Sequence, residues 1–151
     1  FLLEGSLYTF FSILASGLSL PPAQRHGADN LYIQKALGYI QDNYGHSIRV
    51  TDIAEYVCIN RSYLYTLFRE NVGSSPQEYL SGYRLARAAD FLASTELSME
   101  GVAQSCGYHD PAAFGRAFRE RYRMTPLQYR KKYRQEEKEN QEKRRGMPEE
   151  I

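Results

Sequence analysis

The chain has 151 residues, of which 42% are hydrophobic and 25% are charged, and its formal net charge is +1. These ordinary globular values exclude a fibrous or wholly disordered chain, and no apolar run approaches the roughly 18 residues of a membrane span. The two cysteines, Cys58 and Cys106, are too few for a disulfide framework, so we expect a reducing, cytoplasmic setting.

Residues 1–18 predict one helix, because leucine and phenylalanine side chains recur there at close to helical spacing. A single apolar helix cannot bury itself. We therefore expect either the end of a larger unit that has been cut away or a helix that pairs with a partner. Residues 19–29 contain Pro21, Pro22 and Gly27 in a polar context and predict a linker.

The signals over residues 30–134 are all helical. A first helix is expected from Asn30 to about Tyr44, and Thr51 can cap a second one. Residues 75–78 (SPQE) and 125–128 (TPLQ) are capping boxes with proline in the first turn, and Asp110 precedes another such proline. No segment alternates with period two for long enough to predict a strand. The fold class is therefore all-α, with about seven helices preceded by the extra helix and the linker.

An internal repeat organises this region. Ala54 is matched by Ala103 after 49 residues, and three further pairs are matched after 50 residues: Phe68 with Phe118, Pro76 with Pro126, and Tyr79 with Tyr129. Each copy predicts a short helix, a tight turn, a second amphipathic helix and a proline-started helix behind it. Such a unit is a helix-turn-helix, whose second helix can enter a DNA major groove.

The helix expected from Pro76 to Ser94 joins the two copies and is on the order of 30 Å long. A rod of that length can hold two recognition helices about one DNA turn apart, roughly 34 Å, on one face of an asymmetric site. Gly107 supplies a left-handed turn in the second copy, where the first copy has Cys58. A further expectation is an ion pair between Arg84 or Arg87 and Asp90 on the joining helix.

Residues 30–134 resemble the DNA-binding domain of AraC/XylS-type transcription regulators. The motifs are Ala103-x3-Gly107-Tyr108-x5-Phe114-x-Arg116-x-Phe118 and the stretch Ser75-Pro76-x2-Tyr79-Leu80-x3-Arg84-Leu85-x2-Ala88. Cys58 and Met124 depart from the pattern, because glycine is usual at both places. The resemblance implies a bacterial, nucleoid-associated regulator, an activator that contacts RNA polymerase and responds to a sugar or another small molecule through a missing N-terminal domain. By the same resemblance, residues 1–18 are similar to the C-terminal helix of that regulatory or dimerisation domain and can form a homodimer.

The resemblance and the helical spacing together select the contact residues. In the first recognition helix, expected over Asn60–Val72, the candidates for base contacts are Ser62, Tyr65 and Thr66. In the second, expected over Pro111–Tyr122, they are Pro111, Ala112, Ala113 and Arg116. The candidates for phosphate contacts are Arg61, Arg69, Ser75, Arg119, Arg123, Thr125, Lys131 and Lys132.

Other classes of function fit less well. No Walker or dinucleotide glycine pattern is present and no His or Cys lies at ligand spacing, so we expect no enzyme, no metal and no cofactor. Residues 110–134 have eight Lys/Arg against two acids, a local +6, which argues against a helical protein-interaction adaptor. A nucleoid-type binder without sequence preference stays open as an alternative. Residues 135–151 predict a charged tail, whose residues 135–145 fray from the last helix into disorder.

Overall fold

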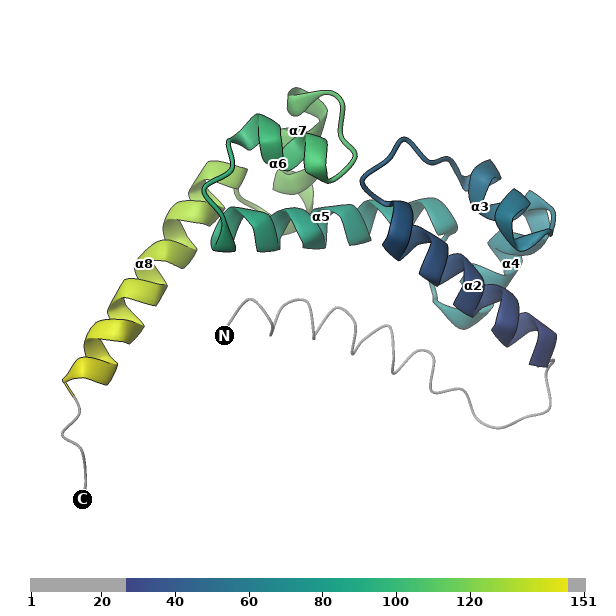
Figure 1. The fold of residues 1–151 in the computed structure, drawn as a ribbon, viewed down its shortest axis with the longest axis horizontal. Coiled ribbons are helices and arrows are strands. Elements are labelled where there is room, and N and C mark those ends of the chain that lie inside the picture. The colour runs from purple at the N-terminus through teal and green to yellow at the C-terminus, as the bar shows by residue number, and fades with distance from the viewer. Residues whose placement is uncertain (1–26, 147–151) are drawn as a thin grey trace, which may run out of the picture.

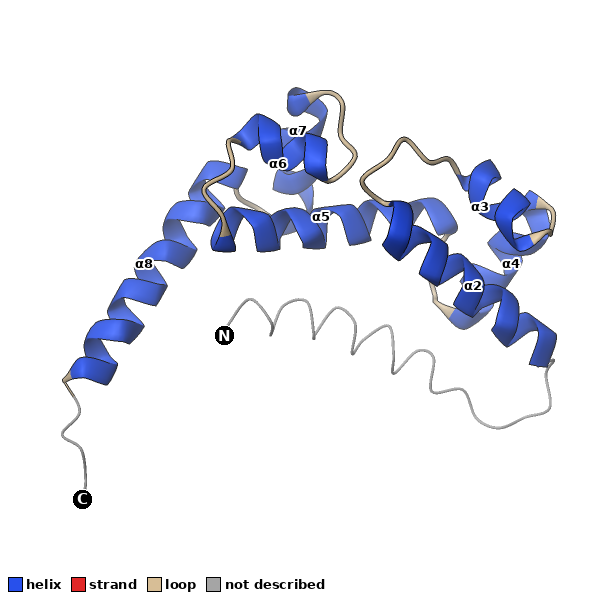
Figure 2. Cartoon of the chain, viewed as in Figure 1, coloured by secondary structure: helices blue, strands red, loops and turns tan. Residues whose placement is uncertain are grey.

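The computed structural model describes residues 27–146, and every regular element in that range is a helix (Figures 1 and 2). The helix predicted over residues 1–18 and residues 19–26 of the predicted linker lie outside the described residues. The seven helices, in chain order, are α2 (Gly27–Asn43), α3 (Val50–Val57), α4 (Arg61–Asn71), α5 (Pro76–Ser94), α6 (Met99–Ser105), α7 (Pro111–Tyr122) and α8 (Pro126–Arg145). The all-α prediction is confirmed, and none of these helices is long and apolar enough to cross a membrane.

Helix α5 belongs to two hydrophobic cores at once. Its first half supplies Tyr79, Leu80 and Tyr83 to a core shared with α2, α3 and α4. Its second half supplies Leu85 and four further apolar side chains to a core shared with α6, α7 and α8. We call these two units the first and the second subdomain, and Figure 1 shows them seated at opposite ends of α5.

The internal repeat extends further than the apolar residues that reveal it. Arg84 of α5 donates from Nε to the Tyr44 carbonyl and from Nη2 to the His46 carbonyl, both at 2.9 Å. Arg134, which lies 50 residues later, donates to the Thr95 carbonyl at 3.2 Å and bonds Glu96. Arg84 thus binds the chain just after α2, and Arg134 binds the chain just after α5. The two subdomains therefore have equivalent arginine contacts at equivalent positions of the repeat.

The ion pair predicted on α5 is confirmed for Arg87 and wrong for Arg84. Arg87 Nη1 lies 3.5 Å from Asp90 Oδ2. Arg84 instead donates to the carbonyl groups of Tyr44 and His46, which follow the end of α2 at Asn43. The Arg84 side chain therefore stabilises the backbone that follows α2, and it forms no ion pair with a carboxylate of the described residues.

Two tight turns have the left-handed backbone that a helix-turn-helix needs. Gly107 has a φ of +85°, as predicted, and Cys58 adopts the equivalent conformation with a φ of 63°. A Cβ atom on Gly107 would lie 2.5 Å from the Tyr44 carbonyl oxygen and 2.9 Å from Arg84 Nε. Gly107 therefore lies where the turn of the second subdomain meets the first, and the hydrogen bond of Ser47 Oγ with His109 Nε2 joins the subdomains at the same junction.

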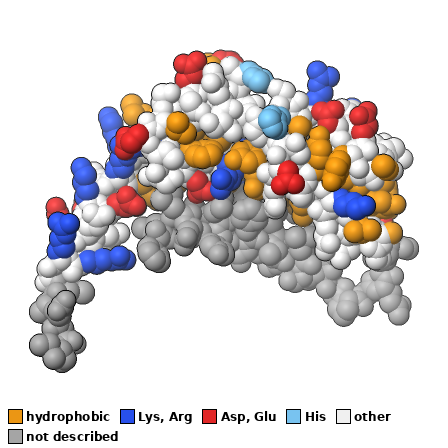
Figure 3. All heavy atoms as spheres, viewed as in Figure 1, with side chains coloured by type: hydrophobic (Ala, Val, Ile, Leu, Met, Phe, Trp, Pro, Cys, Tyr) orange, Lys and Arg blue, Asp and Glu red, His pale blue; other side chains and the backbone are white. Residues whose placement is uncertain are grey.

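Two predicted boundaries and one predicted cap were wrong. Helix α2 begins at Gly27, three residues before the expected start. Helix α3 is capped at Arg49, whose N–H donates to Asp52 Oδ2 at 2.7 Å, and not at Thr51. Helix α8 continues through the predicted disordered residues 135–145, where Glu, Gln, Lys and Arg are good helix formers and the last turn is basic. Charged side chains of both signs are interspersed along α8 (Figure 3).

Candidate nucleic-acid interface

The first recognition helix, α4, turns one face inward and one outward as predicted. Asn60 caps it, its side chain accepting from the Tyr63 N–H at 2.7 Å. Leu64, Leu67 and Phe68 are buried. The three candidates for base contacts are all exposed: Ser62, Tyr65 and Thr66.

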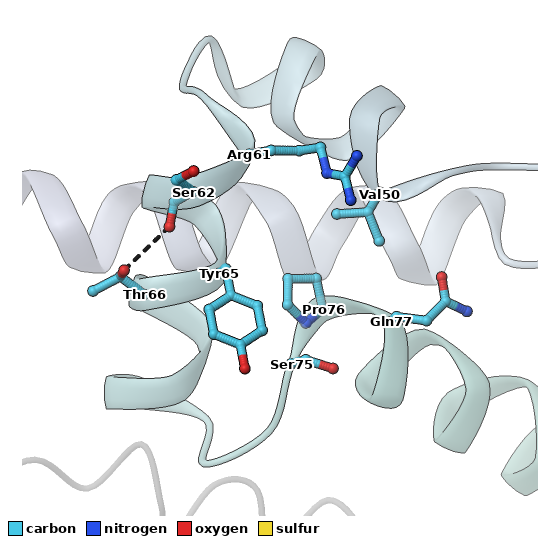
Figure 4. Close-up of a pocket in the computed structure, with 8 residues that line it drawn as sticks. All are labelled: Val50, Arg61, Ser62, Tyr65, Thr66, Ser75, Pro76 and Gln77. Atoms are coloured by element: carbon cyan, nitrogen blue, oxygen red, sulfur yellow. Dashed lines mark hydrogen bonds between the residues drawn. The ribbon is translucent and has the colours of Figure 1, made fainter.

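The outward face of α4 borders an open pocket of about 720 Å³, which Figure 4 shows between α4 and the start of α5. It is lined by Val50, Arg61, Ser62, Tyr65, Thr66, Ser75, Pro76 and Gln77. Three base candidates and two phosphate candidates thus lie around one concave surface. The prediction missed the other three lining residues, Val50, Pro76 and Gln77, although the capping box over residues 75–78 could have suggested the last two.

The second recognition helix, α7, has the predicted bounds and a different chemistry. Asp110 caps it by accepting from the Ala112 N–H at 3.0 Å, and Phe114 and Phe118 are buried. Of the candidates for base contacts, Pro111, Ala112 and Arg116 are exposed and Ala113 is half-buried. Arg116 makes no hydrogen bond or ion pair with any described residue, so its five N–H donors are open to a ligand.

Residues 110–134 contain eight Lys/Arg, but not all of these side chains are available to a ligand. Arg130 donates to the Leu92 carbonyl at 2.8 Å and Arg134 binds the chain after α5, so both serve the fold. Within residues 110–134, five cations are exposed with no partner among the described residues, and the last four of them are phosphate candidates: Arg116, Arg119, Arg123, Lys131 and Lys132.

The two helix starts proposed as phosphate sites are already partly occupied. The Ser75 N–H donates to Glu78 Oε2 at 3.0 Å, and the Thr125 N–H donates to Gln128 Oε1 at 2.9 Å. Their hydroxyls accept from the third helical residue, and the prolines between have no N–H. The free backbone donors at these starts therefore belong to Gln77 and Leu127 and not to the caps.

Arg69 is the phosphate candidate that differs from the other cations. Its Nε donates to the Tyr65 hydroxyl oxygen at 3.0 Å, and its Nη2 lies 3.7 Å from Glu78 Oε1. Thr66, one residue after Tyr65, donates its hydroxyl proton to the Ser62 carbonyl at 3.1 Å (Figure 4). The hydroxyl groups of Tyr65 and Thr66 thus each have a hydrogen-bond partner within α4.

The cysteines and histidines make no reactive site in the described part of the chain. Burial raises the pKa of the Cys106 thiol from 9.0 to about 12, which keeps it a neutral thiol. Cys58 is exposed beside its turn. Among residues 27–146 there is no group of His, Cys, Asp and Glu that could hold a metal ion.

The chain is similar to known helix-turn-helix proteins. The sequence model of a family described as a helix-turn-helix domain matches residues 53–132. The chain is 38% identical over 98 residues to the lactose operon transcription activator of Staphylococcus xylosus, and the match covers 65% of this chain and 35% of that protein. The chain thus spans about a third of the length of that curated relative.

Two solved structures have the same fold. One is a transcriptional regulator of Chromobacterium violaceum described as having an AraC-type DNA-binding domain. It has a TM-score of 0.65 and 26% identity and covers 72% of this chain and 96% of that one. The other is the DNA-binding domain of the global transcriptional factor AdpA in complex with a target DNA, with a TM-score of 0.66, 25% identity, and coverage of 70% and 94%.

Proposed function

This chain belongs to the AraC-type family of helix-turn-helix transcription regulators, and on that premise we propose that α4 and α7 enter two successive major grooves of one asymmetric DNA site. The observation that carries the proposal is that α4 and α7, each with an exposed face, pack against opposite halves of the same helix, α5. Helix α5 has 19 residues, about 28 Å at 1.5 Å per residue, which is close to the roughly 34 Å of one DNA turn.

In this proposal the two helices recognise bases in different ways. Ser62, Tyr65 and Thr66 offer several polar groups, whereas Pro111, Ala112 and Ala113 offer only apolar contact and leave Arg116 as the polar reader of α7. Arginine binds guanine O6 and N7 in a bidentate fashion, so we infer a guanine opposite α7. Arg61, Arg119, Arg123, Lys131 and Lys132 supply phosphate contacts, joined by the free N–H groups at the starts of α5 and α8.

The biological role extends beyond the described residues. We infer an activator that responds to a sugar or another small molecule, because the relative from S. xylosus activates a lactose operon. Contact with RNA polymerase and dimerisation through residues 1–18 and a further N-terminal domain complete the proposal. We infer that the protein binds its DNA site in the bacterial nucleoid, in the cytoplasm.

The experiment is selection of the 151-residue chain on a randomised duplex library at about 150 mM salt. We expect enrichment of two short blocks about one helical turn apart. Retained affinity without enrichment would mean a nucleoid-type binder, and no affinity would mean a protein-interaction adaptor. Either result would refute the proposal.

Two variants then separate base contacts from phosphate contacts on the selected site. Arg116→Ala should cost about 1–3 kcal/mol of binding free energy and relax the choice of base at one position. Lys131→Ala should weaken binding to all sequences alike and reduce the slope of log K against log salt by about 1. Equal effects of both variants on random DNA would contradict these roles.

A further inference from the structure

We propose that Arg69 is a positioning residue that holds Tyr65 for base recognition, and that Tyr65 so held donates a hydrogen bond to an acceptor on a base edge. This inference rests on the proposed function of α4 and goes beyond it in two ways. It removes Arg69 from the phosphate contacts, and it specifies which base atoms Tyr65 can recognise.

The contacts of Arg69 form a continuous chain from α5 to the recognition face. Glu78 is held at the start of α5, where its Oε2 accepts from the Ser75 N–H at 3.0 Å. Its other oxygen, Oε1, lies 3.7 Å from Arg69 Nη2. Arg69 Nε then donates to the Tyr65 hydroxyl oxygen at 3.0 Å. The capping box that starts α5 thereby also anchors a side chain of α4.

The position of Tyr65 fits this arrangement. Arg69 follows Tyr65 by four residues, one helical turn, so the two side chains share a face, and the guanidinium carbon is 5.4 Å from the ring centroid. Tyr65 is 48% exposed, and Figure 4 shows its ring along the pocket with the hydroxyl on the side of Ser75. An aromatic side chain on a helix has two common χ1 rotamers, and the contacts with Arg69 favour one of them.

Arg69 differs from the other arginine and lysine side chains that were predicted to contact phosphates. Arg61, Arg119, Arg123, Lys131 and Lys132 make no hydrogen bond or ion pair with another residue in the described range. Arg69 has a hydrogen bond, an ion pair and a ring contact. A guanidinium shared between Glu78 and Tyr65 is less available to a phosphate, because both partners would have to be given up.

The hydrogen bond also fixes the polarity of Tyr65. A guanidinium has only donors, so the Tyr65 oxygen must accept from it, and the hydroxyl proton is left for another acceptor. Acceptors in the major groove are N7 and O6 of guanine, N7 of adenine and O4 of thymine. Thr66 has the opposite polarity, because its proton is given to the Ser62 carbonyl and only its lone pairs and methyl group remain.

The test uses the duplex selected above and four variants of the 151-residue chain. Tyr65→Phe and Arg69→Met should each lose about three- to tenfold of discrimination at the same base pair, the value of one hydrogen bond. The double variant should lose no more than either single one. Glu78→Gln, which keeps the capping box, should cause a smaller loss at that same position.

The salt dependence separates positioning from phosphate contact. Arg69→Met should leave the slope of log K against log salt unchanged. Arg119→Met, which removes an exposed arginine with no partner among the described residues, should reduce that slope by about 1. A reduced slope for Arg69→Met with base preference intact would overturn the proposal.

A measurement without DNA keeps this inference distinct from the proposed function. In the free protein, the Nε–H proton of Arg69 should exchange with water more slowly in the native chain than in Tyr65→Phe, measured by NMR. Equal exchange rates would overturn the positioning role even if the DNA site is found. Conversely, slow exchange in a chain that selects no DNA sequence would refute the proposed function and with it the base contact of Tyr65.

Discussion

Replacing Gly107 by alanine tests the junction between the two subdomains. Gly107 has a φ of +85°, and the added Cβ would lie 2.5 Å from the Tyr44 carbonyl oxygen and 2.9 Å from Arg84 Nε. Side-chain carbons do not approach a backbone oxygen that closely. The Tyr44 carbonyl must therefore move, although it is also the acceptor for Arg84 at 2.9 Å.

The expected loss follows from three effects. A left-handed backbone costs a residue with a Cβ about 1–2 kcal/mol. Overpacking against the junction adds about 1–3 kcal/mol. The smaller conformational freedom of alanine in the unfolded chain returns about 0.4–1 kcal/mol. The free energy of unfolding should thus fall by about 2–4 kcal/mol, a large part of the 5–15 kcal/mol typical of a domain.

Gly73→Ala is the matched control. Gly73 has nearly the same φ, +81°, but nothing lies within 4 Å of its added Cβ. This variant should lose only about 1 kcal/mol, the cost of the backbone conformation less the unfolded-state gain. Urea unfolding followed by circular dichroism measures both. Equal losses in the two variants would refute the steric argument, and with it the view that the turn at Gly107 fixes the second subdomain against the first.

Three further predictions concern single side chains. Cys58→Gly should raise the free energy of unfolding by about 0.5–1 kcal/mol in urea, because Cys58 has a left-handed φ of 63°, and a loss would mean that its side chain stabilises the turn. Gly38→Ala should raise it by a similar amount, about 0.5–1 kcal/mol, since Gly38 is inside α2 with open space at its Cβ; a lower value would reveal a clash. In a thiol titration at pH 8, Cys58 should react at once and Cys106 only after denaturation, because burial raises the pKa of Cys106 to about 12; a fast phase that persists in Cys58→Ser would contradict this.

The parts of the fold that the sequence predicted depend on local chemistry. The bounds Pro76–Ser94 and Pro111–Tyr122 were predicted correctly because proline, the cap before it and the apolar spacing all act within a few residues. The left-handed turn at Gly107 followed for the same reason. The disorder predicted for residues 135–145 was wrong because low hydrophobicity does not prevent a helix that starts on a packed segment from continuing.

The features that were not predicted depend on contacts between distant segments. The role of Arg84 requires the carbonyl groups of Tyr44 and His46, which are 38 to 40 residues away in the chain. A signal was nevertheless present, because Arg84 and Arg134 are separated by 50 residues, like the apolar pairs of the repeat. The partners of Arg69 were missed because the position of Arg69 on the outward face of α4 does not reveal that Glu78 of the next helix forms an ion pair with it.

The two subdomains share a framework but differ in what they offer to DNA. Arg84 and Arg134 make the same kind of contact in each, and both capping boxes have the same design. The recognition faces differ, since the candidates for base contacts on α4 are three polar side chains, whereas on α7 Arg116 is the one polar candidate. A repeated framework with unlike faces suits a site whose two blocks differ in sequence, because the common spacing is set by α5 and each face can specify its own bases.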